Sequence, residues 1–263
     1  MNLLSGLCGL IVGVANSRSL ACAIAQAAHH AGAEIALSYQ NDRFSKHVHK
    51  IGKELNAAFV SACDVNNDEE IAALGEQVEK QWGRLDFLVH AVAFAKREEL
   101  SGDFLATSRD GFRLALDTSV YSLVGLTRCL TPMLKLGVGA PSVLTLSYLG
   151  GERAVPNYNV MGVAKAALEA AVRYLACDLG PYGIRVNALS PGPVRTLSAA
   201  GVSGLRDLMG FIEHAAPLRR NIDAQDVGDA AVFALSSLSR GVTAEVIHVD
   251  GGYSKTGVPP FTI

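Results

Sequence analysis

The sequence has little that would support a disulfide framework or a structural zinc site. Its cysteines are odd in number, widely scattered and form no CxxC pair, which is the spacing expected of zinc ligands. We therefore interpret them as small core residues and expect a reducing, cytoplasmic location. The five are Cys8, Cys22, Cys63, Cys129 and Cys177.

Long apolar runs and a strong charge of either sign are also absent. No uninterrupted apolar stretch reaches about 18 residues, so no membrane span is expected. The apolar N-terminus has no Lys or Arg before it and is interrupted by glycines, which argues against a signal peptide. The formal net charge is -2, so no basic field favours nucleic acid or anionic lipid. We expect a soluble protein with neither partner.

What the chain does contain is a long alternation of short apolar runs and helical patterns. Apolar residues on both faces of a run are typical of strands covered by helices on two sides. Because parallel strands need crossover helices, we expect an α/β fold, a doubly wound parallel sheet of about seven strands with helices on both faces. No linker divides the chain, so one domain over residues 1–263 is expected. The predicted strands are 7–14, 33–39, 57–65, 85–92, 141–148, 184–191 and 244–252.

The turn after the first predicted strand, GVANSRSLA (13–21), suits a phosphate group. Gly13 permits a tight turn, Ala15 keeps side-chain bulk low, and free amides near Ser19 begin a helix. The full GxGxxG fingerprint is absent, and an ordinary strand–helix turn has similar residues. The turn is therefore compatible with two alternatives. It binds a dinucleotide pyrophosphate, or it is an ordinary turn that binds no ligand.

The ends of the second and third predicted strands carry polar residues. In NAD-binding folds an acidic residue after the second strand binds the ribose hydroxyls, whereas Arg can accommodate a 2'-phosphate. Here Gln40 is neutral, Asp42 acidic and Arg43 basic, so charge does not choose between the two cofactors. Asp64 either binds the adenine amino group or caps the next helix.

Tyr158 and Lys165 stand seven residues apart in NYNVMGVAK (157–165), with Pro156 suited to a helix start. Seven residues at about 100° each return to one helix face, about 10.5 Å along the axis. That span suits a lysine on a cofactor ribose and a phenol on a substrate oxygen, and the positive charge would lower the phenol pKa. The alternative is a core tyrosine and a surface lysine in chance register. Tyr148, at the end of the fifth predicted strand, favours a site.

Taken together, these motifs resemble the short-chain dehydrogenase/reductase superfamily, and within it the bacterial enoyl-acyl-carrier-protein reductases that use NADH. The resemblance runs from residue 3 to about 257 and rests on four segments. Tyr-x6-Lys with a second tyrosine ten residues upstream is its most specific feature, since most of the superfamily has Tyr-x3-Lys. The segments are Gly13-x5-Ser19, YLGGERAVPNYNVMGVAK (148–165), RVNALSPGPVRTLSA (185–199) and VIHVDGGY (246–253).

The resemblance implies roles for particular residues. It makes Tyr148, Tyr158 and Lys165 the catalytic group, with Lys165 on the cofactor ribose and Ala95 beside the substrate. Gln40 resembles the members that use NADH, which favours NADH over NADPH. The implied cofactor-binding positions are Gly13, Ser19, Leu20, Gln40, Asp64, Val65, Val92, Lys165, Val194, Arg195, Thr196, Leu197 and Ser198.

The implied activity is reduction of the 2,3-trans double bond of an enoyl thioester on acyl-carrier protein, in the last reductive step of fatty-acid elongation. The implied assembly is a homotetramer, and no metal is required. Two alternatives share the fold: a ketone or 3-oxoacyl reductase, which Tyr-x3-Lys and an upstream serine would favour, and a non-catalytic cofactor sensor, which the retained tyrosines and lysine disfavour.

Three further features complete the expectations. Residues 192–215 mix small residues with large apolar ones after a strand at the cofactor edge, so we expect a substrate-covering lid. Ala91 and Lys96 depart from the serine and proline of many relatives. His90, on a buried strand, is expected to be a packed core histidine rather than a base.

Overall fold

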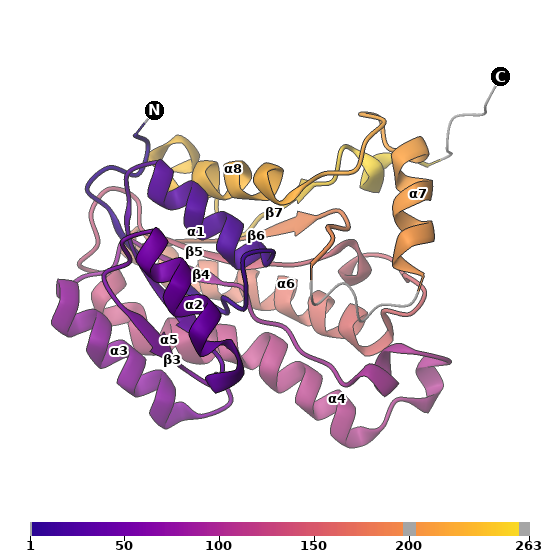
Figure 1. Ribbon diagram of the computed structural model, residues 1–263, viewed down its shortest axis with the longest axis horizontal. Helices are drawn as coiled ribbons and strands as arrows, with labels where there is room; N and C mark the ends of the chain where they lie inside the picture. Colours follow the sequence, from indigo (N-terminus) through magenta and orange to yellow (C-terminus); the bar gives the residue numbers. More distant parts are fainter. Residues whose placement is uncertain (1, 197–203, 258–263) are drawn as a thin grey trace.

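The computed structural model describes residues 2–196 and 204–257, which form one seven-stranded sheet (Figure 1). Every neighbouring pair of strands is parallel, in the order β3-β2-β1-β4-β5-β6-β7. The expected doubly wound parallel sheet is confirmed. The strands are β1 (Cys8–Val12), β2 (Glu34–Tyr39), β3 (Val60–Ala62), β4 (Phe87–His90), β5 (Ser142–Leu146), β6 (Arg185–Pro191) and β7 (Val246–Val249).

Helices cover both faces of the sheet and enclose two large apolar clusters. One cluster joins the strands to α1, α2 and α8, and the other joins them to α3, α5 and α6. In Figure 1, α1 and α8 lie side by side on the first face. The bounds are α1 (Leu20–His30), α2 (Asp42–Glu54), α3 (Asp68–Trp82), α4 (Arg109–Leu116), α5 (Ser122–Leu134), α6 (Asn159–Leu179), α7 (Leu205–Ala215) and α8 (Ala224–Leu235).

Local chemistry explains where the first helices begin. The Ser19 hydroxyl accepts a hydrogen bond from the Cys22 amide at 3.2 Å and caps α1. The Asn67 side chain accepts from the Glu69 and Glu70 amides and caps α3, which begins with three acidic residues. No helix among the described residues is long and apolar enough to cross a membrane.

Residues 111–134 do not form one regular helix. They fall within α4, a π-helical turn η3 (Asp117–Tyr121) and α5. The Ser122 hydroxyl of α5 donates back to the Thr118 carbonyl at 2.6 Å. π-helical turns occur often at functional sites, and this one brings Thr118 to the cavity described next.

Candidate active site

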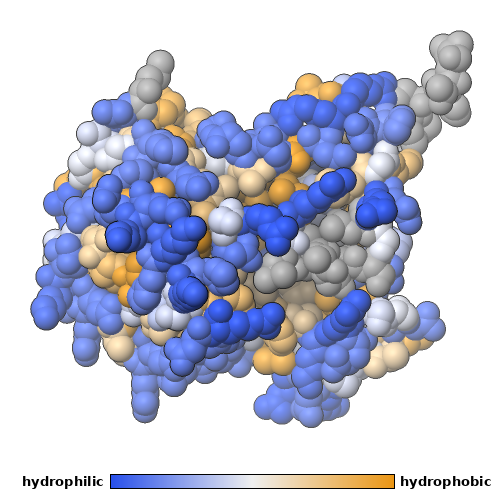
Figure 2. Space-filling view, viewed as in Figure 1, coloured by the Kyte–Doolittle hydropathy of each residue, from blue (hydrophilic) through white to orange (hydrophobic). Residues whose placement is uncertain are grey.

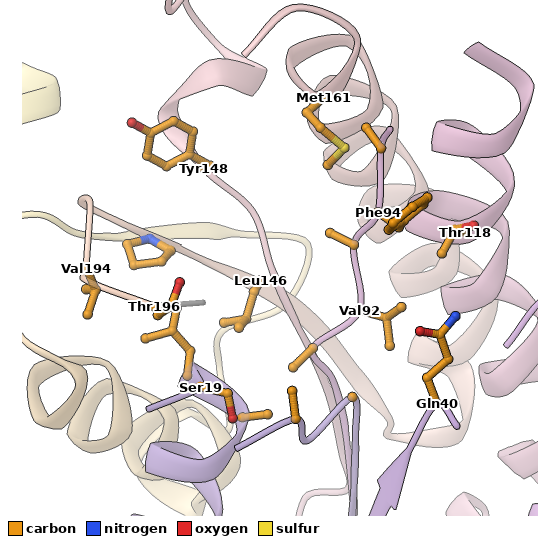
Figure 3. Close-up of a pocket in the computed structure, with 18 of the residues that line it drawn as sticks. Ser19, Gln40, Val92, Phe94, Thr118, Leu146, Tyr148, Met161, Val194 and Thr196 are labelled. Atoms are coloured by element: carbon orange, nitrogen blue, oxygen red, sulfur yellow. The ribbon is translucent and has the colours of Figure 1, made fainter. Parts of the chain in front are cut away.

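A cavity of about 720 Å³ lies beyond the carboxyl ends of the central strands. Its walls come mainly from the segments that follow the strands β1 to β6, which the topology brings to one edge of the sheet. Figure 3 shows Ser19 and Gln40 at one side of this space, with Tyr148 and Met161 across from them. The face of the molecule shown in Figure 2 is mostly hydrophilic, with apolar residues scattered among the hydrophilic ones.

The turn after β1 approaches its neighbour too closely for a side chain. Gly13 has φ of +96°, and a Cβ there would lie 2.4 Å from the Ala91 carbonyl oxygen. Only glycine fits, and the backbone is left open toward the cavity at the start of α1. Leu20 and Ala21, the first residues of α1, also line the cavity. Because a helix N-terminus has free amides, this wall can hold a pyrophosphate.

Most of the residues expected at the site line this cavity. They are Gly13, Ser19, Leu20, Gln40, Val65, Val92, Ala95, Tyr148, Tyr158, Lys165, Val194 and Thr196. Asp64 and Arg195 are not among the lining residues. The Asp64 carboxylate accepts from the Asn66 backbone amide and side chain, as a turn residue before α3 does. Leu197 and Ser198 lie outside the described residues.

The cavity also contains residues that the sequence did not single out. Met161 lies on α6, three residues after Tyr158, and this i, i+3 spacing is the signal by which the sequence could have indicated it. The sequence contains no such signal for Thr118, because only the π-helical turn brings this residue to the cavity. The further lining residues include Asn16, Asn41, Phe44, Phe94, Arg97, Leu100, Leu146, Ser147, Val155 and Leu208.

Tyr148 and Tyr158 form a pair, with ring centroids 4.8 Å apart and planes at 60°. Tyr158 immediately precedes α6, so the helix starts three residues later than Pro156 suggested. Gly150 makes room for the pair, since a Cβ there would lie 2.4 Å from the Tyr158 ring. The two phenols therefore approach one another at the end of β5.

Both phenols are held in the protonated form. Burial, together with Tyr253, raises the pKa of Tyr148 to about 12. Burial and the neighbouring Tyr148 raise the pKa of Tyr158 as well. The expectation that Lys165 lowers the Tyr158 pKa is therefore wrong. The lysine ammonium is bound instead to the Leu146 carbonyl oxygen.

Lys165 is a buried lysine, 4% exposed. Its Nζ donates to the Leu146 carbonyl oxygen at 2.6 Å. Burial lowers its pKa to about 8, and the Glu169 carboxylate opposes that shift. An ammonium has three donors, so donors remain for a ligand in the cavity that Lys165 lines.

His90 is a core histidine, as expected. It is fully buried, with Nδ1 2.8 Å from the Thr145 hydroxyl and Nε2 2.8 Å from the Ser122 hydroxyl. Burial and the nearby Lys165 charge lower its pKa to about 3. A neutral ring with both nitrogens occupied has a structural role and is not a free base.

Comparison with known proteins extends the sequence resemblance. A family model described as enoyl-(acyl carrier protein) reductase matches residues 13–254. The chain is 48% identical to the NADH enoyl-[acyl-carrier-protein] reductase FabI of Nostoc sp., over 97% of this chain and 99% of the relative. It is 49% identical to the Bacillus cereus enzyme of the same name, over 98% and 100%.

Solved structures agree with these matches. The NADH enoyl-[acyl-carrier-protein] reductase of Aquifex aeolicus superposes with a TM-score of 0.94 at 47% identity, over 97% of this chain and 99% of that one. The Bacillus cereus reductase, solved with NADP+ and an indole naphthyridinone, gives 0.95 at 49% identity, over 98% and 100%. The resemblance inferred from the motifs is confirmed, and the chain belongs to the enoyl-(acyl carrier protein) reductase family.

Proposed function

We propose that this chain reduces the 2,3-trans double bond of enoyl thioesters on acyl-carrier protein, with Tyr158, Tyr148 and Lys165 as its catalytic group. The activity follows from the family, and the chain is an NADH-dependent enoyl-acyl-carrier-protein reductase of fatty-acid elongation. The observation that carries the residue roles is the meeting of both tyrosines and Lys165 in one cavity wall.

The residues around the cavity fit a dinucleotide. The Gly13 turn and the first amides of α1 suit the pyrophosphate, while Gln40 and Asn41 lie in the cavity at the end of β2, where a ribose belongs. Lys165, with donors to spare, would bind the nicotinamide ribose. NADH, when bound there, supplies the hydride for the β-carbon of the substrate.

Tyr158 is suited to stabilise the oxygen that gains charge in this reaction. Hydride addition at the β-carbon moves negative charge to the thioester carbonyl oxygen and gives an enolate. The Tyr158 phenol, kept protonated by its raised pKa, would donate a hydrogen bond to that oxygen. The α-carbon then takes a proton from solvent. Tyr148, packed against Tyr158, would shape the pocket beside the thioester.

We also propose that residues 192–215 cover the acyl chain. Leu208 of α7 lines the cavity, which supports a covering role. Met209 and Ile212 of the same helix are buried, so the helix is anchored on one side. The central part of the lid, 197–203, lies outside the described residues.

The homotetramer and the cytoplasmic location are proposals as well. Support for assembly comes from exposed apolar side chains on neighbouring helical segments, namely Tyr121, Val163 and Tyr174, which are 42%, 37% and 77% exposed. Such residues are typical of surfaces covered by a partner. Five free cysteines are consistent with a reducing compartment.

The function is tested by mixing the protein with NADH and a crotonyl thioester and following the nicotinamide absorbance. Loss of absorbance is expected, with a higher kcat/KM for NADH than for NADPH. Tight NADH binding without turnover would indicate a sensor instead. A 3-oxoacyl thioester, run in parallel, should not be reduced.

A further inference from the structure

A buried carboxylate lies beside the proposed catalytic group and has no role in the reaction described above. Glu169 is one helical turn after Lys165 on α6 and is 7% exposed. Its Oε1 accepts a short hydrogen bond from the hydroxyl of Ser147, which is 4% exposed. Ser147 stands between Leu146, which binds Lys165, and Tyr148. The bond therefore joins the lysine-bearing helix to the tyrosine-bearing segment.

The packing around this bond leaves little freedom. The Ser147 amide donates to the Leu189 carbonyl of β6 at 2.7 Å. In the next turn, η4 (Leu149–Gly151), a Cβ on Gly151 would lie 2.8 Å from Glu169 Oε1 and 3.1 Å from the Ala166 amide nitrogen. The chain that carries Tyr148 thus lies directly on α6 at Lys165 and Glu169.

Charged groups from several elements face this junction. Lys165 is acted on by Glu169 within α6, and it faces the neutral His90 of β4. Glu169 faces Glu152 after η4, His248 of β7 and Arg173 of α6. His248 Nε2 lies 2.6 Å from Glu152 Oε1. Glu169 is the carboxylate that offsets the buried ammonium.

We propose that Glu169 and Ser147 are positioning residues of the reductase. Their hydrogen bond fixes Tyr148 relative to Lys165, and the Glu169 carboxylate keeps Lys165 in its charged form. This proposal rests on the role proposed above for Lys165. The effects of the two residues can be separated. Glu169 supplies both the negative charge and the acceptor of the hydrogen bond, whereas Ser147 supplies only the donor.

Two nearly isosteric variants separate these effects in steady-state kinetics with NADH and a crotonyl thioester across pH. Glu169→Gln keeps an oxygen for the Ser147 hydroxyl but removes the charge. We expect the alkaline limb of kcat/KM for NADH to move about one pH unit lower. Ser147→Ala keeps the charge but loses the bond. We expect kcat to fall about tenfold through misplacement of Tyr148, with the limb unmoved.

Asp86→Asn is the matched control. Asp86 is a buried carboxylate, 2% exposed, that accepts from the Cys8 and Val138 amides at the opposite end of the sheet. The Asp86→Asn variant should have a lower Tm. Its alkaline limb of kcat/KM for NADH and its kcat should both be unchanged. The proposal is overturned if the Glu169→Gln profile superimposes on wild type, or if Ser147→Ala changes only Tm.

A fourth variant keeps the two proposals distinguishable. Lys165→Met should raise the KM for NADH and remove the alkaline limb. If it does neither, the role of Lys165 is wrong, whatever the Glu169 and Ser147 variants show. Ser147→Ala removes a single oxygen, so it keeps the proposal open to refutation even if Glu169→Gln fails to fold.

Discussion

The ammonium of Lys165 and the carbonyl oxygen of Leu146 are 2.6 Å apart, so α6 is bound to the end of β5. The next residues along that strand lead to Tyr148, whose ring packs on Tyr158 at the start of α6. A helix and a strand thereby hold the three proposed catalytic groups in one arrangement, and each group can be tested separately.

Binding of NADH is expected to weaken as pH rises above about 8. Burial lowers the Lys165 pKa to about 8, so the ammonium loses its charge and one donor in that range. The KM for NADH, measured across pH, should rise there. Lys165→Arg stays charged at these pH values and should show no such rise; an identical rise in this variant would assign the effect to another group.

Tyr158→Phe should lower kcat about 100-fold, because it removes one donor from the charged oxygen of the transition state. The KM for NADH should change little, since the ring still packs against Tyr148. Tyr182→Phe, at an exposed tyrosine that is not among the cavity residues, is the control. Wild-type kcat in Tyr158→Phe would refute the assigned role.

Stability in acid should depend on His90. Its pKa is about 3 in the folded chain and near 6.5 when unfolded, so the unfolded state binds more protons in between. The contribution of His90 to the free energy of unfolding is therefore fully present above about pH 6.5. It is lost as pH falls toward about 3.

His90→Gln removes that titration. We expect the variant to be less stable by about 1–3 kcal/mol at neutral pH, where it loses hydrogen bonds to Thr145 and Ser122. The difference from wild type should narrow on acidification, as measured by urea unfolding at a series of pH values. A constant difference would mean that the His90 pKa is the same in the folded and unfolded states, so that burial does not lower it.

A homotetramer should appear in light scattering at micromolar concentration, with about four times the 27.6 kDa chain mass. Val163→Glu on α6 places a charge among the exposed apolar residues and should lower that mass. An unchanged mass in the variant would remove this face from the interface, and a wild-type monomer would refute the assembly.

Amides of α7 should exchange hydrogen slowly only when both ligands are present, if residues 192–215 form a lid. NADH with an acyl ligand should slow exchange at Leu208, which faces the cavity. Amides of α8, a helix packed against α1, serve as the reference. Exchange in α7 that is slow without ligand and unaffected by it would show a permanently packed helix.

The sequence by itself determined the sheet. Parallel strands covered by helices are apolar on both faces, and that local signal marked all seven strands, including β3 and β7, which are only partly buried. It also indicated a turn suited to a phosphate group, because Gly13 and a following helix start form a local pattern. The tyrosine and lysine motif was visible because its spacing is fixed along one short segment.

Only the tertiary structure decided how those groups are charged and held. Lys165 could have been a surface lysine by its helix pattern, but β5 and η4 cover it, and burial lowers its pKa. The π-helical turn that delivers Thr118 has no local signature. The partnership of Ser147 and Glu169 spans 22 residues. These features depend on contacts between distant segments, and local residue patterns do not encode which segments meet.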